Sequence, residues 1–351
     1  MPESGNAIEI RVHMRDVGLG NAIFLELPDT RCCVIDWGTT DQAHHQYLLD
    51  TLGDRELAFV AATHGHEDHT AGLPWMFRNL IDLEKGNSRI RRYFIPLAEE
   101  LGYKPIKAVA ETLSAFWNRH PRIGSSRGIE VSEPSFVDGN APPVLIKTEH
   151  YQLLALHPPE AIRSKAELMA AVDGRPSENR PSLVLLLQLA GGQASILFGG
   201  DAQEPAWNAV QRIVEDWPAA DPIGPVTVLS HHGASFSQGM PKWAIERWTR
   251  DGLSLLSTPS ADQHHPDRET LRTVCKTSTE VFCTSYAEVC RQAFTESPTP
   301  TAATIVGDQP CFGNVIVTLR VDGSWEVKHD GPGLRERGYC METEGGFGRT
   351  L

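Results

Sequence analysis

The sequence predicts an α/β fold in which two β-sheets pack together with helices on the outside. Two sets of apolar strand patterns support this prediction, one before residue 62 and one after residue 183, and helical patterns alternate with both sets. No linker rich in Pro, Gly or Ser separates the sets, and no fixed-period repeat is present. We therefore expect a single domain over residues 1–351, with a variable insertion at about 84–150 and a C-terminal hairpin and tail at about 312–351.

The first set of strands is indicated by alternation and by turn glycines. Residues 8–14 alternate apolar with polar side chains, which is typical of a half-buried strand. The segments "DVGLGNAIFLEL" and "RCCVIDWGTT" contain two more strands, with glycines at the turn before the first of them. Helices are expected over 41–53, 71–83 and 108–120, and a buried strand ends at about residue 63.

The second set begins with "SLVLLLQLAGGQASILFGGD", which predicts two strands joined by a Gly-Gly hairpin turn. A helix is expected over 202–217, a strand over 225–233 that ends in histidines, another strand over 252–260 and a helix over 266–277. Residues 314–329 predict a hairpin that turns at Asp322 and Gly323. The second half thus repeats the alternation of strands and helices that the first half shows.

The chain is acidic, with 32 Lys and Arg against 45 Asp and Glu and a net charge of −13. Basic residues cluster only in "SRIRRY" (88–93), whereas proteins that bind long nucleic acids use an extended basic surface. The charge therefore does not favour binding of an extended nucleic acid. It leaves open a small anionic substrate, or a local contact with a short part of a phosphate chain.

Other features of the composition favour a cytoplasmic protein. No apolar run approaches the roughly 18–20 residues of a membrane span, and the first residues lack the pattern of a secretory signal. The seven cysteines form no CxxC pair, which favours buried free thiols over a zinc ribbon or a disulfide scaffold.

The segment "HGHEDH" (64–69) follows a buried strand and supplies four potential metal donors, His64, His66, Asp68 and His69. Such a mixture of nitrogen and oxygen donors suits zinc, manganese or iron(II), whereas calcium and magnesium prefer oxygen ligands alone. Gly65 allows the sharp turn that lets donors on one loop converge. The alternative, a polar turn with hydrogen-bonded histidines, is disfavoured by so many donors in six residues. The segment predicts half of a metal centre.

This HxHxDH segment after an apolar strand resembles the signature of the metallo-β-lactamase fold, a four-layer αβ/βα sandwich with a one- or two-metal site at the sheet edge. Further segments are similar to the branch typified by the soluble domain of the competence protein ComEC. They occur in the same order over roughly residues 8–320: "DVGLGNAIFLEL", "VIDWG", "ENRPSLVLLL", "ILFGGD", "VLSHHGASFS" and "ADQHHPDRETL".

The resemblance implies a ligand set for one or two divalent ions, zinc first and then manganese or iron. His64 and His66 would bind the first metal, Asp68 and His69 the second, and Asp201 would bridge the two. A histidine of the 231–232 pair would complete the second site. Because adjacent side chains of a strand diverge, we expect only one of the pair to be a ligand, and we favour His231, with His232 nearer the substrate.

Several neighbouring roles are also implied. Asp36 is expected to accept a hydrogen bond from a ligand imidazole and to fix its tautomer. Many hydrolases of this fold have a third histidine at the first metal, in a glycine-histidine context that neither candidate in this chain shares. His150 and His157 are the candidates, and the first site would otherwise be open, weak or completed by water. His265 would donate a proton to the leaving group or bind a phosphate oxygen, unless it is a loop histidine that caps the next helix.

These roles predict metal-assisted hydrolysis, in which a metal lowers the pKa of water from 15.7 to about 7. Asp68 or Asp201 would orient the attacking water, so the expected catalytic residues are Asp68, His232 and His265. The resemblance favours a phosphodiester in DNA, RNA or a cyclic nucleotide, and a basic protein partner would reconcile the acidic charge with a longer substrate. The alternatives are a lactonase, thioesterase or β-lactamase of this fold, an iron oxidoreductase, and a non-hydrolytic component of a multi-protein system.

Overall fold

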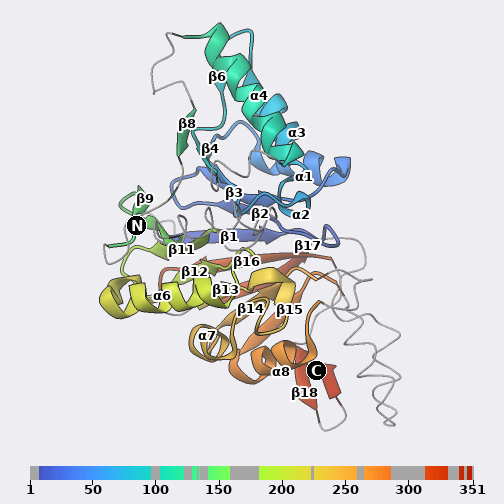
Figure 1. Cartoon of the computed structure of the whole chain (residues 1–351), viewed down its shortest axis with the longest axis vertical. Helices are drawn as coiled ribbons and strands as arrows, with labels where there is room; N and C mark the ends of the chain where they lie inside the picture. The colour runs from blue at the N-terminus through green and yellow to red at the C-terminus, as the bar shows by residue number, and fades with distance from the viewer. Residues whose placement is uncertain are drawn as a thin grey trace, which may run out of the picture.

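The computed structural model describes residues 8–95, 103–121, 129–132, 134, 141–158, 182–222, 225–258, 265–285, 313–330, 340–343 and 346–349. Two large β-sheets face each other, and helices cover the outer side of each sheet (Figure 1). Both sheets mix parallel with antiparallel strands. The predicted fold class, an α/β sandwich of two mixed sheets between helical layers, is therefore confirmed.

The first sheet contains eight strands in the order β17-β16-β1-β2-β3-β4-β7-β8. Their bounds are β1 Glu9–Met14, β2 Ala22–Glu26, β3 Cys32–Trp37, β4 Leu57–Ala61, β7 Arg92–Phe94, β8 Glu130–Ser132, β16 Asn314–Arg320 and β17 Trp325–Asp330. Strand β1 pairs with β16, and Glu9 lies opposite Arg320. Two strands from near the end of the chain thus complete the sheet that the first strand begins.

The second sheet has seven strands in the order β15-β14-β13-β12-β11-β10-β9. Their bounds are β9 Val144–Lys147, β10 Tyr151–His157, β11 Val184–Leu189, β12 Ser195–Phe198, β13 Pro225–Val228, β14 Leu253–Leu256 and β15 Glu280–Cys283. Strands β12 to β15 run parallel, so their carboxyl ends share one edge. Two small hairpins are formed by β5 Ile81–Asp82 with β6 Asn87–Ser88, and by β18 Cys340–Thr343 with β19 Gly346–Arg349.

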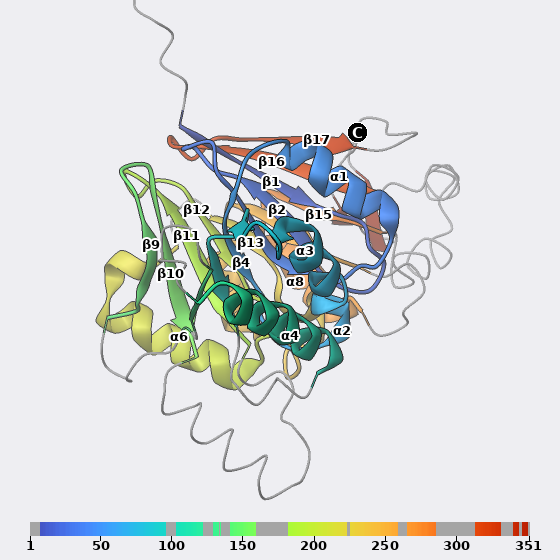
Figure 2. The same ribbon diagram turned by 90° about the horizontal axis from the view of Figure 1, so that it is seen from above.

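Apolar side chains from both sheets meet in a shared core, which includes Val12 and Ile35 of the first sheet and Leu185 and Ile196 of the second. Helices α1 Gln42–Leu52, α3 Leu73–Leu80 and α4 Lys104–Arg119 cover the first sheet, while α6 Glu204–Asp216, α7 Lys242–Trp248 and α8 Arg268–Thr277 cover the second (Figures 1 and 2). Each helix buries an apolar stripe in the core beneath it. This packing fixes the sheet edges that carry the candidate donors.

Most predicted elements are present, with shifted ends. The helix expected over 108–120 begins earlier, at Lys104. The strand expected over 225–233 ends at Val228, and residues Ser230–Gly233 form a 3-10 turn, η3. Residues 84–150 contain strands of both sheets, and the hairpin at 314–330 belongs to the first sheet through β16. The division into one domain with an insertion and a tail stays a prediction.

Two smaller observations complete the fold. Among the described residues no helix is both long and apolar enough for a membrane span. His44 and His45 lie on α1, where the sequence suggests two surface residues. That expectation is wrong for His45, which is buried, stacks on Trp75 at 3.9 Å between ring centroids and hydrogen-bonds Trp37 Nε1 through Nδ1 at 3.1 Å. It fills a gap in the core under α1 as a neutral aromatic ring.

Candidate metal centre

The motif loop begins where the wholly buried strand β4 ends, and it leads into the short helix α2 Glu67–Thr70. Its backbone is held by the segments around β2 and β3: Asn21 N–H donates to the Asp68 carbonyl at 3.0 Å. A Cβ atom on Gly38 would lie 1.6 Å from that carbonyl oxygen, and one on Gly20 would lie 2.1 Å from it. Only glycine permits such close approach, so the glycines of the "DVGLGN" and "DWG" segments fix the position of α2.

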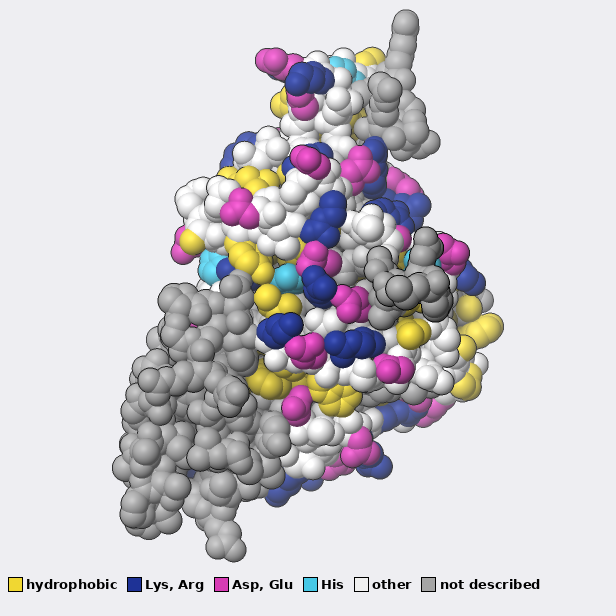
Figure 3. Space-filling view, turned by 180° about the vertical axis from the view of Figure 1, so that it is seen from behind, with side chains coloured by type: hydrophobic (Ala, Val, Ile, Leu, Met, Phe, Trp, Pro, Cys, Tyr) yellow, Lys and Arg dark blue, Asp and Glu magenta, His cyan; other side chains and the backbone are white. Residues whose placement is uncertain are grey.

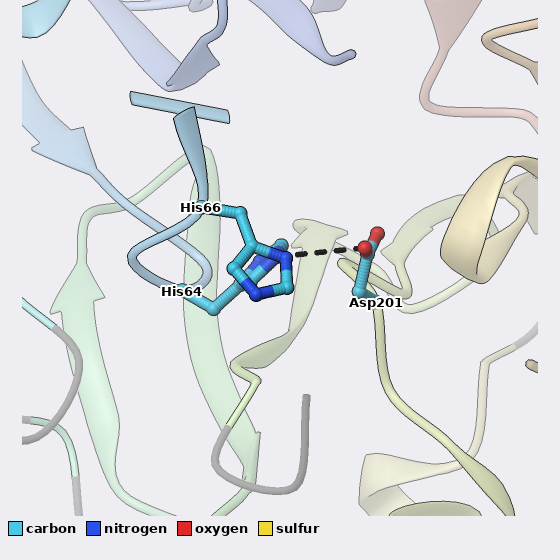
Figure 4. A group of neighbouring side chains, drawn as sticks. All are labelled: His64, His66 and Asp201. Atoms are coloured by element: carbon cyan, nitrogen blue, oxygen red, sulfur yellow. Dashed lines mark ion pairs between the residues drawn. The ribbon is translucent and has the colours of Figure 1, made fainter. Parts of the chain in front are cut away.

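The first cluster of donors contains His64, His66 and Asp201, whose potential ligand atoms all lie within 4.8 Å of one another. Both histidines come from the loop after β4, and Asp201 comes from the turn after β12, so each sheet supplies part of the cluster (Figure 4). His64 Nε2 lies 3.4 Å from Asp201 Oδ2. His64 and Asp201 are buried, whereas His66 is partly exposed.

The second cluster contains Asp68, His69 and His232, again with ligand atoms within 4.8 Å of one another. His69 Nε2 lies 3.2 Å from Asp201 Oδ1, and His232 Nε2 lies 3.5 Å from Asp68 Oδ2. Asp201 therefore stands between the clusters, with Oδ2 toward His64 and Oδ1 toward His69. A carboxylate in this position can bridge two cations.

The unsatisfied atoms of these residues fit a bound metal. Four buried side-chain atoms lack hydrogen-bond partners, namely His64 Nε2, His69 Nε2, His232 Nε2 and Asp201 Oδ1. Leaving a buried polar atom unpaired costs about 1–3 kcal/mol, which makes four of them in one place unexpected unless another group binds there. Mixed imidazole and carboxylate donors suit divalent zinc, manganese or iron.

The other ring nitrogens are held by hydrogen bonds that direct Nε2 inward. His69 Nδ1 lies 2.8 Å from Asp36 Oδ2, which is the hydrogen bond expected for Asp36. Thr63 in turn donates to Asp36 from its backbone N–H and from its hydroxyl, both at 2.7 Å. His232 Nδ1 lies 3.1 Å from the carbonyl oxygen of Ser257. Such outer contacts set the tautomer and orientation of metal-binding imidazoles.

The charges of the centre also suit a cation. Burial, and then the neighbouring His69, lower the pKa of His64 well below its usual value, which keeps its ring neutral. Burial tends to raise the pKa of Asp201, but His69 and His64 outweigh it and keep the carboxylate ionised. Burial tends to lower the pKa of His69, yet Asp201 and Asp36 raise it well above normal. A metal would displace that proton from His69.

The structure brings His232, rather than the favoured His231, into the second donor cluster. Both histidines lie in the η3 turn rather than on a strand, with a positive φ of 50° for His231 and 54° for His232. In this turn the buried His232 joins Asp68 and His69, whereas His231 is 19% exposed and binds the Gln238 carbonyl through Nδ1 at 2.5 Å. His231 Nε2 remains 3.8 Å from Asp201 Oδ2, so it borders the centre.

The two candidates for a third histidine lie at opposite ends of β10. His150 precedes the strand, is partly exposed and lies 3.3 Å from Glu149 through Nε2. His157 ends the strand, is fully buried and bonds the Ser182 carbonyl through Nδ1 at 2.8 Å, while its Nε2 has no partner. Burial lowers the pKa of His157 to about 4, so the ring is neutral. Because Ser182 Oγ also accepts from Asp201 N–H at 2.9 Å, His157 lies on the side of the metal centre.

His265 lies beside the histidine pair, with ring centroids 5.4 Å from His231 and 6.2 Å from His232. It does not cap α8, because Asp267 is the capping residue and accepts from the N–H groups of Glu269 and Thr270. This removes the capping alternative for His265. The preceding His264 lies outside the described residues.

Some contributors to the site were not anticipated from the sequence. Thr63 and the Ser257 carbonyl orient donors, and Tyr103 packs its ring against His66 at 5.7 Å between centroids. A contact made by a backbone carbonyl cannot be predicted from residue type. The contact of Tyr103 with His66 cannot be predicted either, because the two residues are far apart in the sequence. Thr63 could have been suspected from its place directly before the motif.

The fold and its two clusters together define an α/β sandwich with a centre suited to divalent metal ions. Comparison with known proteins agrees: the family model described as the metallo-β-lactamase superfamily matches residues 15–153. The matched segment is less than half of the 351-residue chain, and over that segment the chain is similar to the superfamily. The similarity to the ComEC-like branch stays a prediction. No curated protein sequence matches the chain.

Solved structures of similar fold include the metallo-β-lactamase fold protein YhfI from Bacillus subtilis, at 10% identity and TM-score 0.43, covering 78% of this chain and 95% of that one. A diphosphatase from the PhnP family matches at 12% identity and TM-score 0.34, covering 78% and 85%. A long form of RNase Z from yeast matches at 10% identity and TM-score 0.38, covering 80% and 41%. Likenesses this distant say nothing of the reaction.

Proposed function

We propose that the chain is a metal-dependent phosphodiesterase that acts on short phosphodiesters such as nucleotides, cyclic nucleotides or short oligonucleotides. The supporting observation is the position of Asp201 between two donor clusters, where its carboxylate could be shared by two cations. Paired metals lower the pKa of a water and stabilise the attacking and leaving oxygens of an in-line displacement at phosphorus.

The residues divide into those that hold the ions and those that face the substrate. We assign His64, His66 and Asp201 to the first ion, and Asp68, His69, His232 and Asp201 to the second. Asp68 is 25% exposed, far more than Asp201 at 2%, so Asp68 is placed to orient the attacking water. His265 lies beyond the histidine pair, where it can contact a phosphate oxygen or protonate the leaving group.

We further infer that His157 completes the first site. Its Nδ1 bond to a backbone carbonyl and its unpaired buried Nε2 repeat the condition of His232. His150 shares none of these features, since it lies before the other end of β10. The gap that the sequence leaves in the ligand set is filled most simply by His157.

The surface favours a short substrate. The arginines of the one basic sequence cluster already have partners: Arg89 binds the Gly53 and Arg55 carbonyls, Arg91 binds Glu56, and Arg92 binds the Leu145 carbonyl. Acidic and basic side chains are interspersed on the face shown in Figure 3, without a continuous basic stripe among the residues drawn there in colour. With a net charge of −13, binding of a long phosphate chain would need a basic protein partner, which we keep as a proposal together with a cytoplasmic location.

The test is metal-dependent turnover of bis-(p-nitrophenyl) phosphate, followed by dinucleotides and single-stranded DNA. Asp68→Ala and His66→Ala should each abolish turnover by the metal-loaded enzyme without loss of the folded state measured by circular dichroism. Retained activity in both variants would overturn the assignment. Hydrolysis of a lactone or thioester instead, or bound iron with oxygen-dependent turnover, would favour one of the other functions.

A further inference from the structure

Two buried serines lie directly behind the donor clusters, and each makes two different contacts there. Ser182 stands just before β11 and Ser257 just after β14, and the two residues are 0% and 2% exposed. Neither belongs to a donor cluster. Each serine uses its backbone carbonyl for one contact and its hydroxyl for the other, so each can fix the position of one part of the centre relative to another.

Ser257 links His232 to the backbone that carries Asp68. Its carbonyl oxygen accepts a hydrogen bond from His232 Nδ1 at 3.1 Å, and its hydroxyl donates to the carbonyl oxygen of Gly20. Gly20 in turn lies against Asp68, because a Cβ atom added to Gly20 would be 2.1 Å from the Asp68 carbonyl oxygen. His232 follows a strand of the second sheet and Asp68 follows a strand of the first, so Ser257 sets their separation across the two sheets.

Ser182 makes the corresponding pair of contacts beside the first cluster. Its carbonyl oxygen accepts a hydrogen bond from His157 Nδ1 at 2.8 Å, and its hydroxyl oxygen accepts one from the backbone N–H of Asp201 at 2.9 Å. The next residue, Leu183, donates its N–H to the carbonyl oxygen of Thr63 at 2.8 Å, which ties this segment to the start of the motif loop on the first sheet. Ser182 thus holds the backbone of the carboxylate that both clusters share.

We propose that the hydroxyls of Ser257 and Ser182 are positioning groups that set the metal affinity of the centre. Ser257 acts on the second ion alone, by way of the spacing between Asp68 and His232. Ser182 acts on both ions, because it holds the shared Asp201. Hydrogen bonds behind metal ligands commonly change metal affinity by about 10–100-fold. The proposal rests on the proposed function for its two-ion centre, and it assigns control of that centre to two residues outside the ligand set.

The experiment measures Zn²⁺ binding by the wild type, Ser257→Ala, Ser182→Ala and the control Ser254→Ala. Ser254 is a matched control, because it lies on β14 three residues before Ser257, is fully buried and bonds through its hydroxyl to Ser278 at 2.7 Å, just after α8. Competition with a chromophoric chelator gives the dissociation constant of each ion. Ser257→Ala should weaken the binding of one ion by about tenfold or more, Ser182→Ala that of both ions, and Ser254→Ala that of neither.

Substitution with Co²⁺ gives a spectroscopic measure of the same positioning, because its visible absorption depends on the geometry of the ligands around the ion. Each of the three variants loses one buried hydrogen bond, so a purely structural effect would be common to all of them. The absorption bands should change in Ser257→Ala and Ser182→Ala and stay unchanged in Ser254→Ala.

Neither measurement needs turnover, so failure of this proposal is separate from failure of the proposed function. A protein that shows this pattern of zinc binding but hydrolyses no phosphodiester would keep the roles of the two serines and lose the proposed function. Wild-type zinc affinity in Ser257→Ala or Ser182→Ala, an equal loss of affinity in Ser254→Ala, or fewer than two ions bound by the wild type overturns the proposal.

Discussion

At the scale of single residues, the centre depends on which nitrogen of each imidazole is free. His69, His157 and His232 each engage Nδ1 in a hydrogen bond to oxygen, from Asp36, Ser182 and Ser257 respectively. In all three residues Nε2 is buried without a partner. The outer hydrogen bonds thus prepare the inner atoms for a metal before one binds.

This view predicts different metal contents for two histidine variants. His157→Ala should lower the stoichiometry of the first site and weaken its affinity, because it removes a ligand. His150→Ala should leave both unchanged, since His150 lies before the opposite end of β10. Elemental analysis after dialysis against a weak chelator measures the difference. A His157→Ala protein with full metal content would contradict the assignment.

A second residue-scale prediction concerns Glu26, away from the centre. Its carboxylate lies 3.0 Å from His13 Nε2 and 2.7 Å from Arg55. The hydrogen bond from His13, and then that from Arg55, lower the pKa of Glu26 from 4.5 to about 2. Because the folded pKa is depressed, the stabilisation is present above about pH 4.5 and is lost as the pH falls toward 2, with an upper limit of about 3 kcal/mol.

Glu26→Gln should therefore reduce the free energy of unfolding near pH 7 by about 1–3 kcal/mol, and the difference should shrink below pH 4.5. Urea unfolding at a series of pH values provides the measurement. Glu9→Gln is the matched control, because within the described part of the chain Glu9 forms an ion pair with the half-exposed Arg11 alone, a contact worth about 1 kcal/mol at most. A pH-independent effect of Glu26→Gln would show that the charge of Glu26 is not responsible.

At the scale of elements, α2 is positioned by backbone contact. The carbonyl of Asp68 lies against Gly20 and Gly38 and accepts a hydrogen bond from Asn21. The loop before β2 and the turn after β3 thereby set where the carboxylate of Asp68 stands relative to Asp201. A shift of the helix would separate the donors although no donor had changed.

Gly38→Ala should displace α2 and abolish metal-dependent turnover, because the added Cβ would lie 1.6 Å from the Asp68 oxygen. The cost to folding should be about 3 kcal/mol or more, at the upper end for overpacked sites. Gly18→Asn provides the control: a Cβ there meets nothing within 4 Å, and Asn tolerates the φ of 76°. Metal content and thermal unfolding of the two variants decide the question, and normal activity in Gly38→Ala would refute the role of the contact.

At the scale of the whole molecule, the metal centre joins the two sheets. His64 to His69 follow β4 of the first sheet, and Asp201 and His232 follow β12 and β13 of the second. An ion bound by both sets would act as a cross-link between the sheets. Metal binding and the docking of the sheets should therefore stabilise each other.

Removal of metal should accordingly destabilise the entire fold. At a metal concentration 100 times Kd, chelation should cost about 2.7 kcal/mol, or roughly 4 °C in Tm. Asp201→Ala should show no further loss with chelator, because the residue shared by both sites is gone. Differential scanning fluorimetry with and without EDTA measures both proteins. An equal shift in the two would mean that the chelator acts elsewhere.

Much of this arrangement could be predicted from the sequence because the patterns that indicate it lie within short segments. Alternation and turn glycines indicated the strands, and the density of donors at 64–69 indicated the centre. The sequence alone does not decide features that depend on three-dimensional relations. The choice between His231 and His232 depended on a left-handed turn, and the choice between His150 and His157 depended on which end of β10 meets Asp201. The role of Tyr103 depended on where helix α4 begins in space, because Tyr103 is distant from His66 in the sequence.

The pairing of β1 with β16 has a consequence for the order of events during synthesis. Glu9 emerges from the ribosome early, but its partner Arg320 emerges only when most of the chain has been made. Until then β1 has an open edge that any other extended segment could occupy. The donors at 64–69, 201 and 232 all precede β16 in the chain, so they are synthesised before the first sheet can close. Loss of the last forty residues would thus leave every proposed ligand in the chain but remove the partner strand of β1. We expect such a chain to aggregate through the open edge of β1 although all of its metal ligands are present.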